Sequence, residues 1–397
     1  MNSLKTVIKT LSAKYADEFI DIRNHLHKYP ELSFKEYKTA EFIAKKLNEY
    51  GVSFTSGIAE TGVLAIIEGK NPSSKVIAIR ADMDALPIEE TNEVPYKSCN
   101  AGIMHACGHD VHIACLLGAT KILNELKNDF EGTIKLIFQP SEESFPGGAI
   151  KMIEAGVLEN PKVEMVIGQH VLPQLEAGKM GLKPGMYMAS TDEVYLTVKG
   201  KGGHAATPEL NVDPIIISAQ ILVALQQVVS RFGNPAIPSV LSFGKIIGNG
   251  RTNIIPDEVK IDGTLRTFNE QWRKEAHEHI ISIAKSIAKG MNGDCDVFID
   301  KGYPFLVNDE NLTKQFKNEA IEFLGASNVV DLDLRMTAED FAYFTQKVPS
   351  CFYRLGVGNP NKGIISNLHT STFNIDESSI ETGVGLMAWL AIESLKK

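Results

Sequence analysis

Three short apolar segments, each followed by polar residues, constrain the fold of this chain most strongly. Residues 76–79, 134–138 and 163–167 are apolar runs of strand length, and segments with the apolar spacing of helices separate them. After the first run we expect a helix with Asp110 as its N-cap. Strands that alternate with helices predict an α/β layer built on a mostly parallel sheet.

The rhythm changes in the middle of the chain. There the pattern runs strand, helix, strand, strand, helix, strand, and Asp213 with Pro214 marks the start of the first of these helices. This is the element order of a ferredoxin-like α+β domain. We therefore predict a catalytic α/β domain made of residues 1–186 and 300–397, with a ferredoxin-like domain inserted at residues 187–299.

Composition narrows the partners and the compartment. The 397-residue chain has a formal net charge of −9 and no block of Lys or Arg, so nucleic acid is not expected as a partner. Its five cysteines are scattered and odd in number, which is typical of a reducing compartment without a disulfide framework. We find no apolar run typical of a signal peptide and expect no membrane span. These features predict a cytoplasmic protein without a membrane partner.

Polar side chains gather where the predicted strands end. Strand by strand they are Asp82 and Asp84, Glu142 and Glu143, and His170. Sites in open α/β sheets form beyond the carboxyl ends of the strands. Bringing several such groups together is costly unless they are paired or bind a metal. The strand ends therefore predict a functional site.

The segment MHACGHDVH, residues 104–112, supplies softer side chains for this site. Cys107 and His109 are two residues apart, so in extended chain both point to the same side. Thiolate, imidazole and carboxylate suit zinc or a similar divalent ion. Glu142 and Glu143 point to opposite sides in extended chain, so one can bind metal while the other faces substrate. The pattern predicts hydrolysis by a metal-activated water, with a carboxylate accepting its proton.

Other interpretations of these residues stay open. Cys107 and His109 could be the nucleophile and base of a cysteine amidase, which would survive EDTA, whereas a metal enzyme would not. A binding protein with a structural metal would have an ion closed off by protein ligands and no proton acceptor beside it. For His105 and His112, hydrogen bonding to neighbouring groups is the favoured interpretation.

The motifs taken together resemble the M20 metallopeptidase family, in particular its amidohydrolase branch of aminoacylase-like, hippurate-hydrolase-like and auxin-conjugate-hydrolase-like enzymes. The resemblance covers nearly the whole chain and follows the family's order of motifs. In this sequence they are LHKYPELSFKEYKTAEFI, RADMDALPI, MHACGHDVH, FQPSEE, QHVLP, GKGGHAATP, TNIIPD, GTLRTF, AEDFAYF and LHTSTFNID.

The resemblance implies a specific set of site residues. It implies two divalent metal ions per subunit, which could be zinc, manganese, nickel or cobalt. The implied metal ligands are Cys107, His109, Glu143, His170 and His369. Glu142 would be the general base, and Asp84 would orient a metal ligand from behind.

The resemblance also gives the inserted domain the roles of a lid and a dimerisation domain. His204 would polarise the scissile carbonyl or stabilise its oxyanion, reaching the site from the other subunit of a homodimer or a higher oligomer. Asn253 would lie near the same oxygen. Arg266 would hold a substrate carboxylate through two hydrogen bonds; an internal ion pair is the alternative role for this arginine.

The activity implied by the resemblance is hydrolysis of the amide bond in N-acyl amino acids or similar small conjugates. A dipeptidase or carboxypeptidase is the alternative within the same chemistry, because the family includes both. The cysteine amidase and the metal-binding protein without catalysis remain the rivals from other classes. The motifs specify the family far more closely than they specify a substrate.

Overall fold

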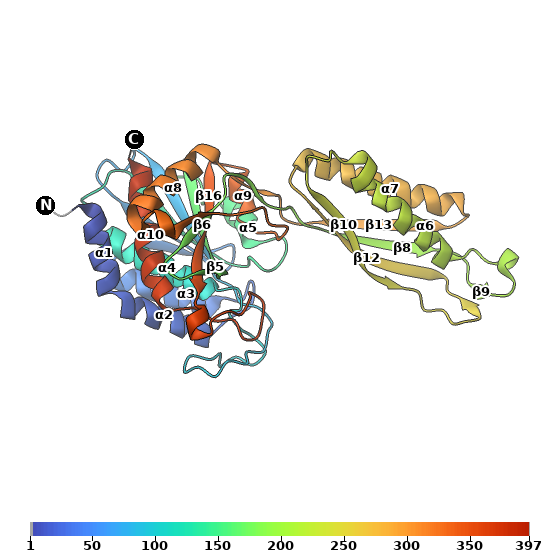
Figure 1. Cartoon of the computed structure of the whole chain (residues 1–397), viewed down its shortest axis with the longest axis horizontal. Helices are drawn as coiled ribbons and strands as arrows, with labels where there is room; N and C mark the ends of the chain where they lie inside the picture. The colour runs from blue at the N-terminus through green and yellow to red at the C-terminus, as the bar shows by residue number, and fades with distance from the viewer. Residues whose placement is uncertain (1–2, 397) are drawn as a thin grey trace. The chain divides into compact units, whose positions relative to one another are not determined.

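The computed structural model describes residues 3–396, and these form two compact units. Among the described residues, the first unit contains 3–185, 307–333 and 340–396, and the second contains 186–306 and 334–339. Figure 1 traces both units along the chain. The second unit thus extends beyond the predicted limits of 187–299, because residues 300–306 and 334–339 pack with it.

The first unit is built on an eight-stranded sheet in the order β1-β2-β4-β3-β5-β16-β6-β15. Its strands are β1 (Ser53–Ile58), β2 (Gly62–Glu68), β3 (Val76–Asp82), β4 (Thr133–Gln139), β5 (Met165–Glu176), β6 (Met180–Leu182), β15 (Val329–Asp331) and β16 (Ser350–Gly358). β3 pairs in parallel with β4 and β5, and β5 pairs in parallel with β16. The centre of the sheet is parallel, so the carboxyl ends of β3, β4 and β5 meet at one edge.

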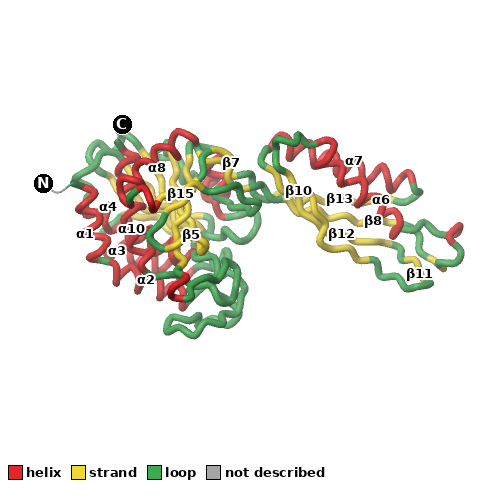
Figure 2. Tube along the Cα trace, viewed as in Figure 1, coloured by secondary structure: helices red, strands yellow, loops and turns green. Residues whose placement is uncertain are grey.

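Helices surround this sheet (Figure 2). They are α1 (Leu4–Lys14), α2 (Ala16–Lys28), α3 (Tyr37–Glu49), α4 (His109–Glu125), α5 (Gly148–Glu154), α8 (Glu310–Leu324), α9 (Ala342–Thr345) and α10 (Ser378–Leu395). α4 and α10 pack against each other and are buried along most of their length, which explains their nearly continuous apolar and small residues. Gly118 makes this contact possible, since a Cβ there would lie 2.5 Å from Val384 Cγ2.

Two local predictions need correction. α4 has Gly108 as its N-cap, with a φ of 82°, and Asp110 lies in the first turn instead of capping the helix. The Asp110 carboxylate instead binds Arg23 and His27. β5 continues well past residue 167, so His170 lies within the strand and does not follow it.

The second unit has the element order predicted for a ferredoxin-like domain. Its main elements are β8 (Asp192–Lys199), α6 (Pro214–Gln227), β10 (Ser239–Ile247), β12 (Glu258–Thr267), α7 (Glu270–Gly290) and β13 (Asp294–Lys301). The four strands form an antiparallel sheet in the order β10-β12-β8-β13, and α6 and α7 pack against each other and against the sheet. β9 (Gly203–His204) pairs with β11 (Ile254–Ile255), and β7 (Gly185–Met188) and β14 (Leu306–Asn308) lie where the chain passes between the units.

The expectation that no segment could span a membrane does not hold for one helical stretch. By length and composition alone, residues 214–232 are long and apolar enough to cross a membrane, with a mean hydropathy of 1.6. In the structure 28% of this window is buried. One face of α6 packs into the core of the second unit through Ile217, Ile221 and Leu225. The other face leaves Ile216 and Val223 exposed.

A buried carboxylate ties the segment before α3 to the loop after β4. Glu36 is fully buried and accepts hydrogen bonds from Ser141 N at 2.8 Å and from Thr61 Oγ1 at 2.7 Å. Burial, reinforced by the nearby negative charge of Asp84, raises the pKa of Glu36 from 4.5 to about 7.

We expect this shift to make the stability of the metal-free protein depend on pH. Between its unfolded pKa of 4.5 and its folded pKa of about 7, Glu36 ionises in the unfolded chain before it ionises in the folded one, so stability falls as the pH rises. Glutamine cannot ionise, so Glu36→Gln removes this loss. From pH 5 to pH 8 its free energy of unfolding should rise by roughly 2 kcal/mol relative to that of wild type. Urea unfolding of EDTA-treated protein at both pH values measures the difference. Glu41→Gln, at an exposed position of α3, is the matched control, and equal gains for both variants would contradict the assignment.

Candidate metal centre

Five side chains with metal-ligating atoms converge at the carboxyl edge of the parallel strands. They are Cys107 in the loop before α4, His109 in its first turn, Glu143 after β4, His170 in β5 and His369 in the loop before α10. Cys107 Sγ lies 3.4 Å from His170 Nε2 and 3.3 Å from His369 Nε2. Glu143 Oε1 lies 3.2 Å from His369 Nε2 and 3.9 Å from His109 Nε2. The structure therefore brings together all five residues implied as ligands.

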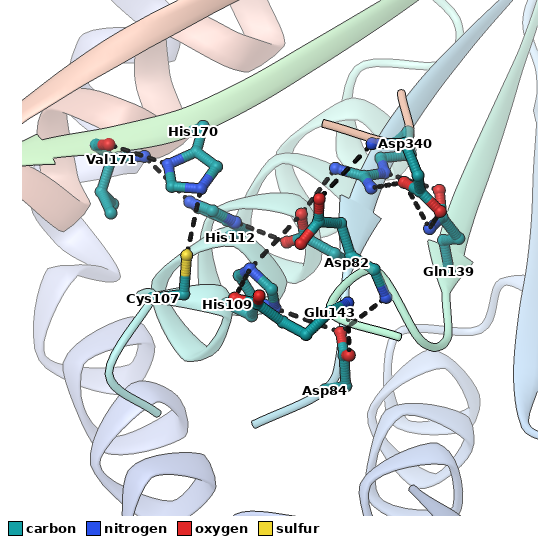
Figure 3. A network of polar contacts seen from close by, with 12 residues as sticks. Asp82, Asp84, Cys107, His109, His112, Gln139, Glu143, His170, Val171 and Asp340 are labelled. Atoms are coloured by element: carbon teal, nitrogen blue, oxygen red, sulfur yellow. Dashed lines mark hydrogen bonds and ion pairs between the residues drawn. The ribbon is translucent and has the colours of Figure 1, made fainter. Parts of the chain in front are cut away.

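The donor set fits a divalent ion of the zinc type. His109 Nε2 is buried and has no hydrogen-bond partner among residues 3–396. His109 Nδ1 lies 3.2 Å from Asp84 Oδ1, and His170 Nδ1 donates to Val171 O at 2.8 Å (Figure 3). Each ring thus uses Nδ1 for orientation and turns Nε2 toward the other donors, as metal-binding histidines do. Thiolate, imidazole and carboxylate are the ligands that zinc and neighbouring divalent ions accept.

Asp84 organises the loop that carries both glutamates. Its two carboxylate oxygens accept hydrogen bonds from Glu142 N at 3.0 Å, from Glu143 N at 2.9 Å and from Ser33 Oγ at 2.6 Å. Burial alone would raise the pKa of Asp84, but the hydrogen bonds from His109, Ser33 and the Glu143 amide outweigh it and lower that pKa. Asp84 therefore stays ionised and holds His109 and the two glutamates in fixed relative positions.

The two adjacent glutamates face different neighbours. Glu142 is 6% exposed, and its Oε1 lies 3.4 Å from Asp340 N. Glu143 faces Cys107 and His369 instead. Ligating atoms of Glu142, Glu143 and His109 nevertheless lie within 4.8 Å of one another. One carboxylate can therefore ligate while its neighbour accepts a proton at the same place.

The electrostatics of the centre favour a cation over a reactive thiol. Burial raises the pKa of Cys107 well above its ordinary value, and the charges of Glu143, Glu142 and Asp82 add to the rise. Burial opposes the charged form of His109, but Asp82, Asp84 and Glu143 outweigh it and raise its pKa to about 10. A nucleophilic cysteine needs surroundings that stabilise the thiolate. The site is acidic, which argues against the cysteine amidase.

The backbone of His369 has a conformation that is uncommon for residues other than glycine. Its φ is 59°, in the left-handed region that non-glycine residues seldom adopt. His369 N donates to Ala106 O at 2.8 Å, so the loop before α10 is fastened to the segment that carries Cys107. The side chain is 52% exposed, unlike those of the other four residues. His369 therefore closes the centre from the solvent side.

The remaining histidines of MHACGHDVH lie beside the centre without joining it. His112 Nδ1 contacts Asp82 Oδ1 at 2.5 Å, and its Nε2 accepts a hydrogen bond from Val171 N at 2.9 Å. Both ring nitrogens of His105 are buried with no hydrogen-bond partner in the part of the chain that the structure describes. The hydrogen-bonding role expected for these two histidines is therefore found for His112 only.

A buried network that the sequence patterns do not predict lies beneath the centre. Arg80, fully buried in β3, donates to Asp82 at 2.6 Å, to Asp340 at 2.6 Å and to Gln139 at 2.8 Å. Gln139 also donates to Asp340 at 2.8 Å. The available signal was an arginine inside an apolar strand, because a buried guanidinium requires acceptors.

The three site residues predicted in the insert belong to the second unit. His204 in β9 is exposed. The next residue, Ala205, donates its N–H to Asn253 O at 3.1 Å, so Asn253 lies beside the segment that carries His204. Arg266 in β12 is half-buried, and its Nη1 has no hydrogen-bond partner within residues 3–396. The charges of Asp192 and Glu193 act on the Arg266 guanidinium, so an internal ion pair and a substrate carboxylate both stay open as its partners. The roles of all three residues at the centre stay predictions.

Comparison with known proteins agrees with the motifs and the centre. Residues 78–393 match peptidase family M20/M25/M40. The chain is 41% identical over 363 residues to the N-acetyl-L-cysteine deacetylase of Bacillus subtilis, covering 91% of this chain and 85% of that protein. It is 39% identical to thermostable carboxypeptidase 2 of Saccharolobus solfataricus, covering 100% of this chain and 99% of that one.

A solved structure gives the same result for the fold. The crystal structure of the Bacillus subtilis YXEP protein, described as a dinuclear metal-binding peptidase of the M20 family, superposes with a TM-score of 0.83 at 33% identity. The match covers 96% of this chain and 99% of that one. Sequence match, relatives and fold agree, and we conclude that the chain belongs to peptidase family M20/M25/M40.

Proposed function

We propose that this protein is a metal-dependent amidohydrolase that cleaves the amide bond of N-acyl amino acids or similar small conjugates. The observation that carries the proposal is the convergence of five metal-ligating side chains from separate segments, with the carboxylate of Glu142 beside them. The family membership supports the same chemistry, as do the Bacillus subtilis deacetylase and the N-acyl-L-amino acid amidohydrolase of Geobacillus stearothermophilus, which is 43% identical over 304 residues.

Two divalent ions would be held by Cys107, His109, Glu143, His170 and His369. When bound, such ions polarise a carbonyl group and lower the pKa of water to about 7. The donor chemistry and the buried, unpartnered Nε2 of His109 support this assignment. The description of the Bacillus subtilis relative as dinuclear supports a pair of ions.

The chain's own residues divide the remaining work. Glu142 accepts a proton from the attacking water and delivers it to the nitrogen of the leaving amine. Asp84 holds the backbone of Glu142 and the ring of His109, which keeps the base at a fixed distance from the ligands. The Asp340 amide steadies the Glu142 carboxylate from the other side.

Removing the base should stop turnover without emptying the centre. Glu142→Gln keeps the size of the side chain but cannot take up a proton, so we expect turnover to fall by roughly 10²- to 10⁴-fold. Metal content should equal that of wild type. Steady-state rates beside metal analysis test this, with the exposed Glu154→Gln as the control for loss of a charge. Wild-type turnover in the Glu142 variant would remove this residue as the base.

His204 is proposed to stabilise the oxyanion of the scissile carbonyl. Its Nδ1 accepts a hydrogen bond from Ala206 N at 3.1 Å, so the neutral ring carries its proton on Nε2. The exposed Nε2–H is then a donor for a developing negative charge. Asn253 is proposed to lie near the same oxygen, and Arg266 to bind a substrate carboxylate with its unpartnered guanidinium nitrogen.

We propose that the inserted domain, predicted at 187–299, is a lid through which two subunits form a homodimer. Ile216 and Val223 on the outer face of α6 are 51% and 71% exposed. β10 is an edge strand of its sheet, and Ile246 and Ile247 on it are exposed. An apolar helix face beside an open strand edge is typical of a protein interface. We propose a cytoplasmic location for the dimer, without membrane or nucleic-acid partners.

A mixed dimer can test whether His204 acts across subunits. His204→Ala should lower turnover and leave metal content unchanged, because the residue binds no metal in this proposal. Mixing it with Glu142→Gln should restore activity, up to roughly a quarter of wild type per total protein, through dimers that carry one intact site. The lack of any recovery in a verified heterodimer would exclude a site shared between subunits.

A carboxypeptidase or dipeptidase is the second candidate, and the Saccharolobus solfataricus relative specifically favours it. Both activities use the same centre and differ in the substrate that fits beside it. A screen of acetyl-, benzoyl- and longer-chain acyl amino acids against dipeptides, with metal-reconstituted enzyme, separates them. Hydrolysis of dipeptides alone would replace the amidohydrolase proposal with the peptidase.

A further inference from the structure

His112 lies between two of the proposed metal ligands, yet neither of its own ring nitrogens is available to a metal. The side chain is fully buried, and its ring centroid lies 4.6 Å from that of His170 and 5.4 Å from that of His109. Nδ1 contacts Asp82 at 2.5 Å, and Nε2 accepts from Val171 N at 2.9 Å (Figure 3). The ring therefore links a carboxylate to the backbone of β5.

The hydrogen-bond partners fix the tautomer of His112. A backbone N–H can only donate, so Nε2 must be the unprotonated nitrogen, and Nδ1 carries the proton that it donates to Asp82. Asp82 also accepts from Arg80 Nη1 at 2.6 Å. Asp82 thus accepts on both of its oxygens, on Oδ2 from Arg80 and on Oδ1 from His112, and an asparagine in the same position has an NH₂ group in place of one of them.

The contact to Val171 replaces a missing strand partner. β3 and β5 pair only as far as Arg80 and Gly168, and β3 ends at Asp82. Beyond that point the amide of Val171 is bound by His112 instead of by β3, while on the other side of β5 Val171 pairs with Leu355 of β16. The carbonyl of the same residue accepts the Nδ1 proton of His170 at 2.8 Å. Fixing Val171 therefore fixes the direction in which His170 points its Nε2.

We propose that His112 is a positioning residue that, with its tautomer set by Asp82, holds Val171 and thereby aims His170 Nε2 at the metal centre. The inference rests on the proposed function, because it assumes that His170 is a ligand. His112 itself touches neither substrate nor ion. Partners of this kind, one contact removed from the metal, typically contribute 10- to 100-fold to metal affinity.

The main test is His112→Phe in the full-length protein. Phenylalanine keeps an aromatic ring of similar size but offers no acceptor to Val171 and no donor to Asp82. We expect the affinity for Co²⁺, measured on metal-free protein by competition with a chelator, to fall roughly 10- to 100-fold for one ion of the pair. The visible absorption of the Co²⁺-loaded protein should also change, because it reports on the ligand geometry that His170 helps to set.

Three further variants separate positioning from packing. His112→Gln keeps an acceptor for Val171 and should recover most of the lost affinity. Asp82→Asn can accept from Arg80 or from His112 but not from both, so it should lose affinity to a similar degree. His105→Phe is the matched control, since His105 is equally buried in the same segment and has no hydrogen-bond partner among residues 3–396.

The outcomes distinguish this inference from the proposed function. Wild-type protein that binds no Co²⁺ would overturn the proposed function itself. Wild-type protein that binds it, with His112→Phe and Asp82→Asn binding equally well, would overturn the positioning role alone. An equal loss in His105→Phe would assign the effect to packing and also overturn it. If His112→Phe does not fold, Asp82→Asn against wild type decides the question by the same two measurements.

Discussion

The buried guanidinium of Arg80 is the interaction on which the rest of the centre depends. It lies in β3, an inner strand of the parallel region, and has no exposure to water, so its charge must be balanced by protein groups. Asp82 and Asp340 supply that balance, each at 2.6 Å. Asp82 also binds His112, which contacts β5, and the Asp340 amide donates a hydrogen bond to Glu142. One strand residue therefore supports both the metal side and the proton-transfer side of the site.

This arrangement also explains why the centre is acidic. Burying several carboxylates beside a thiol and three imidazoles would be unfavourable in the absence of cations. Hydrogen bonds to Asp84 and ion pairs to Arg80 compensate part of that cost. The remaining ligating atoms are left to face one another at 3.2 to 3.9 Å. Divalent ions can compensate the remaining cost of burying these carboxylates. The geometry and the charge of the centre therefore both support a metal site.

Local pattern was enough to predict the parallel sheet and part of the site. Cys107 and His109 are near in sequence, and the glutamate pair directly follows a predicted strand, so sequence spacing alone is enough to predict these four as site residues. His369 comes from a loop 226 residues after Glu143, and only the family resemblance pointed to it. Arg80 and Asp340 were missed because one lies inside an apolar run and the other outside any strand end. The N-cap of α4 was misplaced because Asp110 is used in tertiary contacts with Arg23 and His27, and tertiary contacts override capping preference.

The position of β16 has a consequence for how the protein is made. This strand lies between β5 and β6 in the sheet, although the whole second unit is synthesised before it. At ribosomal rates of roughly 5–20 residues per second, about 9 to 35 s separate the emergence of β5 from that of β16. During that interval an apolar parallel strand has an unpaired edge in a growing chain, which is a template for aggregation. Slower translation through the insert lengthens this interval, and a chaperone that covers the exposed edge of β5 would counter the risk of aggregation.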